Sequence, residues 1–467
     1  DYFCNVLYFT DEYYNLYSVT YVYWVEWLGA KGLLYSNSGF VSGTNFSNSY
    51  FYDVFHSEYD KFYNQGENIS IYDYRFLNNE KFQGEGWFWK SLQSTETLTD
   101  TFSTPGLYTD LPQTSTFKLF AYPTYRNLSS VSEHSLEIKV NGTLISTISS
   151  NDFNRIDTTV TFQSNLLSAT TVNTVTVKYN YVLDPSNNIP SLMNFDFYEI
   201  KYPRSFKLVN EKLSSNTGLP DTTSKQFRVS GYNNINPVNI YDVNNNIKIS
   251  NTSFSADTLK YTGKSNGKFE IVNNNISKKP FRIKQKTVPN LVSNSNGADY
   301  LLIYNKLFST PAEQLRVYRE TRDNYRSVKT EIEDIYDIFN FGLEDPVAVK
   351  RFTTYVYGNW QQPKLKYICL LGRGSFDPKK NLSSSVYYNN LIPVYGNPST
   401  DGYFANVNTG TFFYYDQIAI GRLPAYTVSE AQTMVDKIIA YESQTPEIWW
   451  KEFSYITGGG NYTEQQS

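Results

Sequence analysis

Hydrophobic and polar residues follow two different patterns along this chain. Between residues 105 and 205, apolar residues alternate with polar ones in segments that recur roughly every ten residues, such as "STFKLFAYPTY" and "TVNTVTVKYNYV". This period of two is typical of strands with one buried face. The segment "VNGTLI" at 140–145 places Asn-Gly between two alternating runs, which predicts a hairpin. We therefore expect residues 105–205 to form an antiparallel β-sandwich.

The segments on either side of this module also have a β pattern. Residues 1–104 are rich in aromatic side chains, and the alternation in "YSVTYVYWVEW" predicts a strand. The tryptophans of this region either form a platform that stacks on carbohydrate or cover the core of a thin sheet. Residues 206–290 contain short apolar runs between Asn-rich turns and predict a second small β unit. The tryptophans concerned are Trp24, Trp27, Trp87 and Trp89.

Near residue 291 the pattern changes to buried strands that alternate with amphipathic helices. "DYLLIYNKLF" and "YICLLG" are apolar runs typical of parallel strands buried on both faces. In the last predicted helix one face is apolar, and alternating β and α elements indicate a largely parallel sheet covered on both sides. The residues expected on that helix face are Ala431, Met434, Val435 and Ile438.

Capping signals mark three predicted helix starts in this part. Thr310 is the expected N-cap of the first helix, with Pro311 at its first position and Glu313 completing a capping box. Asp345 precedes Pro346 at the start of another helix. The final helix begins behind a second capping box, formed by Thr427 and Glu430.

The loop "GRGSFD" at 372–377 follows the strand "YICLL" and is the strongest candidate for chemistry. Parallel strands deliver such loops to the carboxyl edge of the sheet, where open α/β folds keep their sites. We expect Arg373, Asp377 and Asp401 to lie on the rim of a cleft at this edge. The two aspartates either accept hydrogen bonds from loop backbones or hold a calcium ion through oxygen ligands.

Composition and charge exclude several classes of protein. The chain has 467 residues, too many for one core, and a net charge of −4 without a basic block. We therefore expect no nucleic-acid partner. No run of about 18 apolar residues exists, so we expect no transmembrane helix. The only cysteines are Cys4 and Cys369, which excludes a cysteine-rich zinc site, and Cys369 is expected to be a buried free thiol.

The order of segments in 299–463 resembles the gingipain family of cysteine peptidases, whose catalytic domain is a caspase-like α/β fold. Two segments nearer the N-terminus, "YVYWVEWLGAKGLL" and "YDVFHSEYDKFYNQ", narrow the resemblance to the surface sortases of the type IX secretion system of Bacteroidetes. The matching C-terminal segments are "DYLLIYNKLF", "VKTEIEDIYDIFNFGLEDPVAVKRFTTYVY", "YICLLGRGSFDPKKN", "IPVYGNPSTDGYFA", "DQIAIGRLPAYTVSEAQTMVDKIIAYE" and "YITGGGN".

This resemblance implies a multidomain chain with β-rich N-terminal modules followed by an incomplete gingipain-type α/β domain. The expected parts are an aromatic β-rich region at 1–104, the β-sandwich at 105–205, a small β unit at 206–290 and the α/β domain at 291–467. It also implies a protein on the extracellular face of the outer membrane that needs no cofactor. Its substrates would be secreted cargo proteins, whose C-terminal signal it cleaves before passing the new carboxyl end to a lipopolysaccharide. Its partner would be an outer-membrane β-barrel anchor of the PorV type.

The catalytic dyad of the family has no match in this sequence. The resemblance implies a histidine between two glycines and a downstream cysteine nucleophile, with backbone N–H groups that stabilise the oxyanion. The only histidines are His56 and His134, neither lies between glycines, and Cys369 precedes the family's dyad positions. We expect the dyad beyond residue 467, because a sheet of three or four strands leaves an apolar face open. The alternative is a non-catalytic scaffold that docks a partner or glycan at the cell surface.

Overall fold

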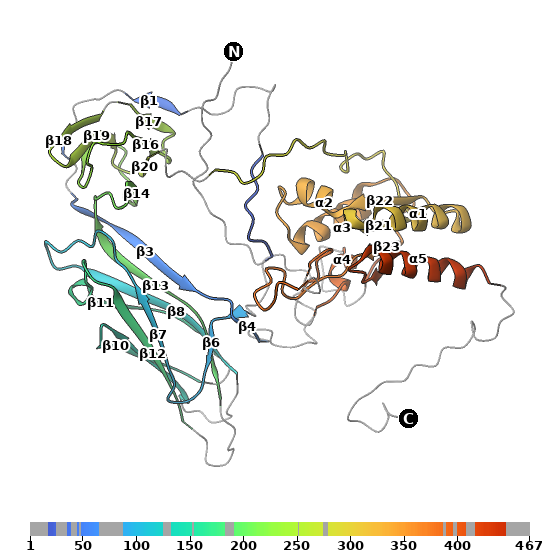
Figure 1. Cartoon of the computed structure of the whole chain (residues 1–467), viewed down its shortest axis with the longest axis horizontal. Helices are drawn as coiled ribbons and strands as arrows, with labels where there is room; N and C mark the ends of the chain where they lie inside the picture. The colour runs from blue at the N-terminus through green and yellow to red at the C-terminus, as the bar shows by residue number, and fades with distance from the viewer. Residues whose placement is uncertain are drawn as a thin grey trace. The chain divides into compact units, whose positions relative to one another are not determined.

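The computed structural model describes most of the chain in two compact units. We call Asp1–Val25, Ser70–Gln83 and Lys286–Ser467 the α/β unit, and Glu26–Ile69 with Gly84–Gln285 the β unit. Figure 1 shows helices α1–α5 in the α/β unit. The described residues are 17–24, 35–38, 44–45, 48–64, 87–124, 132–151, 154–182, 191–250, 252–273, 279–385, 389–395, 399–407 and 416–444.

Two antiparallel sheets form the first core of the β unit. One sheet has the strand order β10-β9-β12-β7, and the other has the order β11-β8-β13-β3, with β6 also paired to β13. Their inward side chains pack into one hydrophobic cluster, so the predicted β-sandwich is confirmed, and it includes β3, β6 and β7 from before residue 105. The strands are β3 (Tyr50–Glu58), β6 (Lys90–Leu92), β7 (Thr97–Phe102), β8 (Thr114–Pro123), β9 (His134–Val140), β10 (Thr143–Ser150), β11 (Ile156–Gln163), β12 (Asn173–Tyr181) and β13 (Met193–Ser205).

The predicted hairpin joins β9 to β10. Asn141 and Gly142 both have positive φ angles, 49° and 81°, and Val140 lies opposite Thr143. Two central residues with positive φ are the signature of a type I′ turn, whose twist matches that of the flanking strands. The Asn-Gly pair therefore fixes the register of this edge of the sandwich.

A second pair of sheets follows the sandwich within the β unit. The orders are β1-β17-β16-β20-β14 and β18-β19-β15-β2, and both sheets pack on a core in which the Phe227 and Phe269 rings lie 4.6 Å apart. A Cβ at Gly263 would lie 2.5 Å from the Phe269 ring, so this glycine makes room for the core. The strands are β1 (Ser36–Ser38), β2 (Thr44–Asn45), β14 (Lys212–Asn216), β15 (Ser224–Val229), β16 (Val238–Asp242), β17 (Ile247–Ile249), β18 (Thr252–Ser255), β19 (Thr258–Lys264) and β20 (Lys268–Asn273). A short pair, β4 (Phe62–Tyr63) and β5 (Trp87–Phe88), lies along the chain between β3 and β6 of the sandwich.

The structure tests two predictions for the aromatic N-terminal region: the role of its tryptophans and the strand around residues 17–24. Trp87 and Trp89 are each only 7% exposed, so they cover a core and do not form a carbohydrate platform. Trp24 is exposed and Trp27 lies outside the described residues. The strand predicted from "YSVTYVYWVEW" is wrong for residues 17–24, which pair with no other strand. There the indole N–H of Trp24 donates to the Phe341 carbonyl oxygen at 2.8 Å, so the segment is held by side-chain contact instead of a backbone ladder.

The α/β unit contains the predicted parallel sheet, with the strand order β22-β21-β23-β24. Successive residues of β21 and β23 point to opposite faces and enter two separate clusters. Leu370 packs with residues of α2 and α3, whereas Leu371 packs with residues of α1 and α5. The elements are β21 (Tyr300–Tyr304), η4 (Lys306–Phe308), α1 (Ser309–Asp323), β22 (Ser327–Glu331), α2 (Ile332–Phe339), α3 (Pro346–Asn359), β23 (Tyr367–Leu371), α4 (Gly402–Ala405), β24 (Ala419–Leu423) and α5 (Val428–Glu442).

The predicted apolar face of α5 is confirmed. Ala431 and Val435 are fully buried, and Met434 and Ile438 pack against the same cluster. The helix begins at the predicted capping box, in which Thr427 accepts from the Glu430 N–H and Glu430 reaches back to the Thr427 N–H.

The start of α3 is also as predicted, but that of α1 is not. Asp345 accepts a hydrogen bond from the Val347 N–H at 2.8 Å. Thr310 is not the N-cap of α1, because a 3₁₀ turn capped by Asn305 runs directly into the helix and places Thr310 inside it. Glu313 instead forms an ion pair with Arg316 at 2.7 Å.

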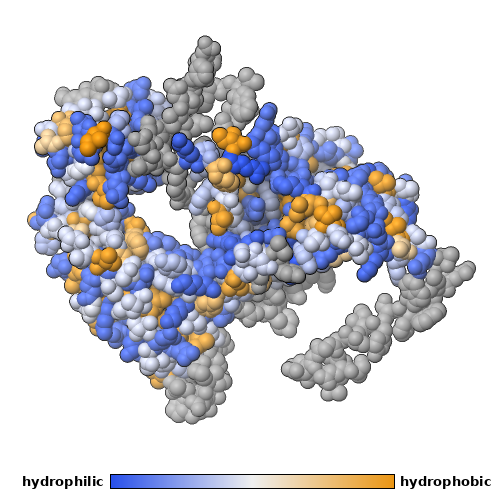
Figure 2. All heavy atoms as spheres, in the orientation of Figure 1, coloured by the Kyte–Doolittle hydropathy of each residue, from blue (hydrophilic) through white to orange (hydrophobic). Residues whose placement is uncertain are grey.

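Exposed hydrophobic side chains are scattered among the described residues. Figure 2 shows hydrophobic residues as small separate groups among polar ones on the face in view. Among the described residues, no helix is long and apolar enough to cross a bilayer.

Candidate functional site at the carboxyl edge of the parallel sheet

The loop after β23 is held tightly at the carboxyl edge of the sheet. Gly372 has a φ of +148°, and a Cβ at this position would lie 2.7 Å from a side-chain carbon of Ile392. A Cβ at Gly374 would lie 2.8 Å from the Ile392 carbonyl oxygen. The Gly372 N–H donates to the Leu423 carbonyl oxygen at 3.0 Å. Both glycines are therefore needed for the close approach of two backbone segments.

One largely buried arginine, with 11% of its side chain exposed, connects this loop to its neighbours. Arg422 of β24 donates to both carboxylate oxygens of Asp401, at 2.9 and 2.7 Å. Its remaining N–H groups donate to the carbonyl oxygens of Gly372, Ile392 and Pro393, at 2.8, 2.8 and 2.9 Å. All five guanidinium donors thus have a partner, which offsets the cost of burying the charge. We call this arrangement the Arg422 clamp.

Asp401 is positioned by a second buried cation. It directly precedes the short helix α4, and the ammonium group of Lys350 in α3 donates to the carbonyl oxygens of Tyr403, at 2.9 Å, and Asn406. The hydroxyl of Thr353 donates to the Phe404 carbonyl oxygen at 2.8 Å. Residues of α3 therefore bind the carbonyl groups of α4 that have no partner inside such a short helix.

The three residues predicted at the cleft rim have separate roles. Arg373 has an exposed side chain, while its carbonyl oxygen accepts from the Leu391 N–H at 2.9 Å. Asp377 is fully buried and accepts hydrogen bonds from the backbone N–H groups of Asn381 and Leu382, both at 2.8 Å. This is the loop-capping role that the sequence left open for it. Asp401 belongs to the clamp, and calcium binding at either aspartate stays a prediction.

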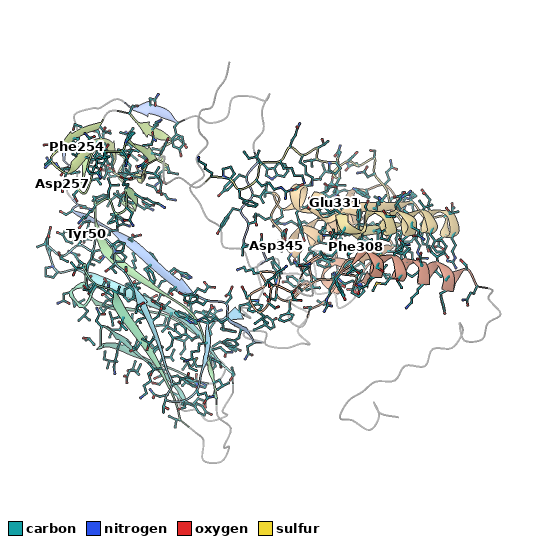
Figure 3. All side chains as sticks on the ribbon, in the orientation of Figure 1. Tyr50, Phe254, Asp257, Phe308, Glu331 and Asp345 are labelled. Carbon is teal, nitrogen blue, oxygen red and sulfur yellow. The ribbon has the colours of Figure 1, made fainter. Side chains whose placement is uncertain are left out.

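Negative charge gathers at the neighbouring end of β22. Burial, followed by the charges of Glu333 and Asp334, raises the pKa of Glu331 at the end of this strand. Figure 3 labels Glu331 there, together with Asp345 at the start of α3. Lys306 forms an ion pair with Glu333, and Lys286 forms one with Asp334 at 2.9 Å, so part of the charge is neutralised. The carboxyl edge therefore presents acidic groups at β22 and an exposed cation, Arg373, after β23.

The histidines and the described cysteine do not form a catalytic dyad. Cys369 is buried in β23, and burial raises the pKa of its thiol to about 11. His134 is buried in β9, where its Nδ1 lies 2.9 Å from the Tyr179 hydroxyl. His56 lies in β3, where its hydrogen bond to Glu58 raises its pKa. Both histidines belong to the β unit and Cys369 to the α/β unit.

Sequence analysis missed Arg422, although "DQIAIGRLP" contained a usable signal. An arginine inside an otherwise apolar parallel strand must have acidic or carbonyl partners, since a lone buried charge is very costly. The sequence could not identify those partners, because Asp401, Gly372 and Ile392 come from different loops.

The Arg422→Gln variant should lose about 3 kcal/mol of unfolding free energy, since it leaves Asp401 and three carbonyl groups without their partner. Denaturant unfolding of the α/β unit measures this loss. The matched control is Arg373→Gln in the same loop, where the side chain is exposed and the expected change is within about 0.5 kcal/mol. Equal midpoints for Arg422→Gln and the unmodified protein would contradict the role of the clamp.

Cys369 should react slowly with alkylating reagents at pH 8, because its thiol is buried and only the thiolate is nucleophilic. The measurement is mass spectrometry of a Cys4→Ser variant, in which Cys369 is the only thiol. We expect full labelling in denaturant and little labelling of the native protein over the same time. Labelling at the same rate in both conditions would show that Cys369 is accessible.

Comparison with known proteins agrees with this architecture. Residues 293–467 match the sequence profile of Peptidase family C25. No curated protein matches the chain. Among solved structures, the chain is similar to dimeric latent PorU from Porphyromonas gingivalis, with 15% identity, a TM-score of 0.64 and coverage of 90% of this chain. The match covers 40% of the PorU chain, so this chain spans about two fifths of its length.

Two further solved structures have only low similarity to parts of the chain. They are a β-glucosidase from Paenibacillus barengoltzii, with 12% identity over 24% of this chain and 10% of its own, and a β-glucuronidase from Bacteroides uniformis, with 10% identity over 69% and 47%. Their TM-scores of 0.15 and 0.16 carry no argument about fold. The resemblance to gingipains in the sequence is thus confirmed: the chain has the fold of PorU, and residues 293–467 are a domain of peptidase family C25, the gingipain family.

Proposed function

We propose that this chain is part of a surface sortase of the type IX secretion system. The observation that carries the proposal is the similarity to PorU across 90% of the chain, which includes the β modules as well as the peptidase domain. A C25 domain alone supports only a peptidase. The added β modules are what favour the sortase among the members of that family. In this proposal the protein cleaves the C-terminal signal of secreted cargo at the extracellular face of the outer membrane and passes the new carboxyl end to a lipopolysaccharide anchor.

The carboxyl edge of the parallel sheet supplies the surface for an extended peptide in this proposal. The Arg422 clamp fixes the loop after β23, so the exposed side chain of Arg373 projects from a rigid support. The acidic groups near Glu331 offer the opposite charge on the same edge. The nucleophile and the base have no counterpart among the described residues, and Cys369 has no catalytic role.

The second candidate is a non-catalytic scaffold that docks a partner or glycan at the cell surface. It is favoured by one observation, the burial of Cys369 together with the placement of both histidines in the β unit. The two candidates differ in what they predict for cargo processing.

Deletion of the coding gene in its own bacterium should leave the C-terminal signal on secreted cargo, which mass spectrometry of the cargo detects. Re-expression of the unmodified gene should restore cleavage. A Cys369→Ala variant should restore it equally well, because this thiol is buried away from solvent. Normal cleavage in the deletion strain would exclude the sortase and leave the scaffold as the better account.

We further propose that an outer-membrane β-barrel of the PorV type holds the protein at the surface. The described helices include none that could span a bilayer, so attachment by a partner is the simplest arrangement for a surface sortase. Affinity purification of the tagged protein from detergent-solubilised outer membranes should recover such a barrel. Recovery of the protein entirely in the soluble fraction of cells that process cargo normally would contradict the anchor.

A further inference from the structure

On one side of β13, the pairing partner changes along the strand from β6 to β3, and we call this point the junction. Glu58, the last residue of β3, lies opposite Phe197 of β13, whereas β6 pairs with β13 only up to Phe195. The pairing of β13 with β8 also shifts register between Phe195 and Phe197. Asp196 therefore lies at the bulge, between the two strands that share this side of β13. Bulges re-aim a side chain locally and recur beside functional sites.

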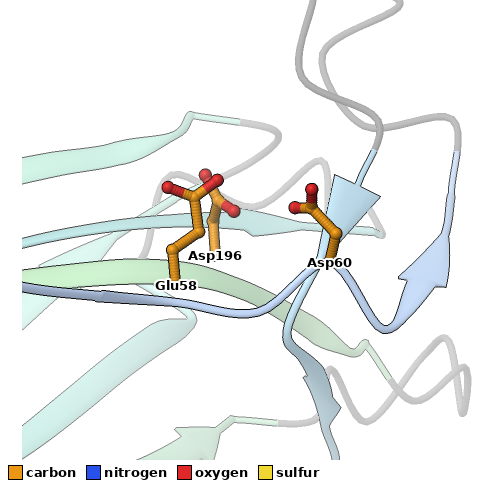
Figure 4. Close-up of side chains that lie close together, drawn as sticks. All are labelled: Glu58, Asp60 and Asp196. Atoms are coloured by element: carbon orange, nitrogen blue, oxygen red, sulfur yellow. The ribbon is translucent and has the colours of Figure 1, made fainter. Parts of the chain in front are cut away.

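Three carboxylates meet at this junction. Figure 4 shows Glu58 and Asp196 side by side, with Asp60 close to them in the connection that follows β3. One carboxylate oxygen from each residue lies within 4.8 Å of the other two. Asp196 is only 3% exposed. Three carboxylate oxygens this close together have the spacing of ligands around one cation.

An independent observation on the same strand also points to a ligand. The side chain of Asn194 is fully buried, and neither atom of its amide makes a hydrogen bond within the part of the chain that the structure describes. Met193 and Phe195 both pack in the sandwich core, so Asn194 between them lies on the opposite face of β13. Glu58, opposite Phe197, lies beside that face. A buried amide without partners on this face of β13, two positions before Asp196, indicates a missing ion or water.

We propose that Glu58, Asp60, Asp196 and Asn194 form a calcium-binding site in the β unit. All four offer oxygen atoms, and no sulfur or imidazole nitrogen lies among them, which favours a hard cation over zinc or copper. Calcium accepts irregular sets of carboxylate and amide oxygens, whereas magnesium demands near-ideal octahedral geometry. The site is independent of the proposed sortase function.

His56 orients one of the ligands. Its Nε2 lies 2.8 Å from Oε2 of Glu58, and its Nδ1 lies 3.2 Å from a carboxylate oxygen of Glu199. A hydrogen bond from outside the ligand set fixes the direction of a metal-binding carboxylate. His56 thus leaves Oε1 of Glu58 for the ion.

A bound ion would join three segments at the junction. Glu58 belongs to β3, Asp60 to the connection toward β4, and Asp196 to the bulge of β13. The ion would therefore stabilise the point where β3 departs from the sandwich, and calcium should raise the unfolding temperature of the β unit.

Terbium luminescence tests this site, since Tb³⁺ replaces calcium and is excited by nearby aromatic rings. Tyr59, next to Asp60, packs against Trp89 with ring centroids 4.7 Å apart. We expect bound Tb³⁺ to give a luminescence signal with the full chain. Calcium should displace the Tb³⁺ with a dissociation constant of about 1 mM or below, as in extracellular modules. Magnesium at the same concentration should displace it poorly.

Variants locate the ion and provide the control. Asp60→Asn should weaken calcium binding by roughly tenfold, and Asp196→Asn by at least as much. Asp196 is buried, so the Asp196→Asn variant could fail to fold, and circular dichroism of each variant checks for this. If it does not fold, the Asp60→Asn variant alone decides the test. Glu137→Gln, at an exposed ion pair with Lys139, should bind calcium as the unmodified protein does.

Two results would overturn the proposal. One is the absence of calcium binding by the unmodified chain at about 10 mM, well above the range of extracellular sites. The other is undiminished binding in the folded Asp60→Asn variant, which would place the ion elsewhere.

Discussion

The ion pair between Arg422 and Asp401 is the interaction on which the carboxyl edge depends. The guanidinium of Arg422, near the end of β24, loses most of its hydration, and this loss is compensated only when every donor finds an acceptor. Arg422 meets that condition with one carboxylate and three backbone carbonyl groups. The same bonds that satisfy the charge therefore determine where the loops after β23 and before α4 can lie.

The sheet beneath this edge explains why the loops are the only place for polar chemistry. Leu302 and Leu371 point to one core, and Leu301 and Leu370 to the other, so neither face of the strands is free. In these two central strands, β21 and β23, charged groups can enter only where the strands end. The structure accordingly places the exposed side chain of Arg373 and the acidic group near Glu331 at that end.

The sequence was informative wherever a local pattern decided the structure. The Asn141-Gly142 turn and the capping box of α5 depend on residues a few positions apart, and both were predictable. Alternation in residues 17–24 predicted a strand wrongly, because a strand also needs a neighbour, which the local sequence does not reveal. The Arg422 clamp and the carboxylates around Asp196 were missed for a related reason, since each joins residues that only the fold brings together.

The hydrogen bond from Trp24 to the carbonyl oxygen of Phe341 joins residues that are 317 positions apart. The α/β unit is thus discontinuous, and the two segments of the β unit alternate with its three segments along the chain. During synthesis the ribosome must complete the β unit before Phe341 emerges. Until then Trp24 cannot make its hydrogen bond to Phe341. Closure of so long a loop carries a high entropic cost. The order of synthesis therefore lets this contact form only after the whole β unit has been made.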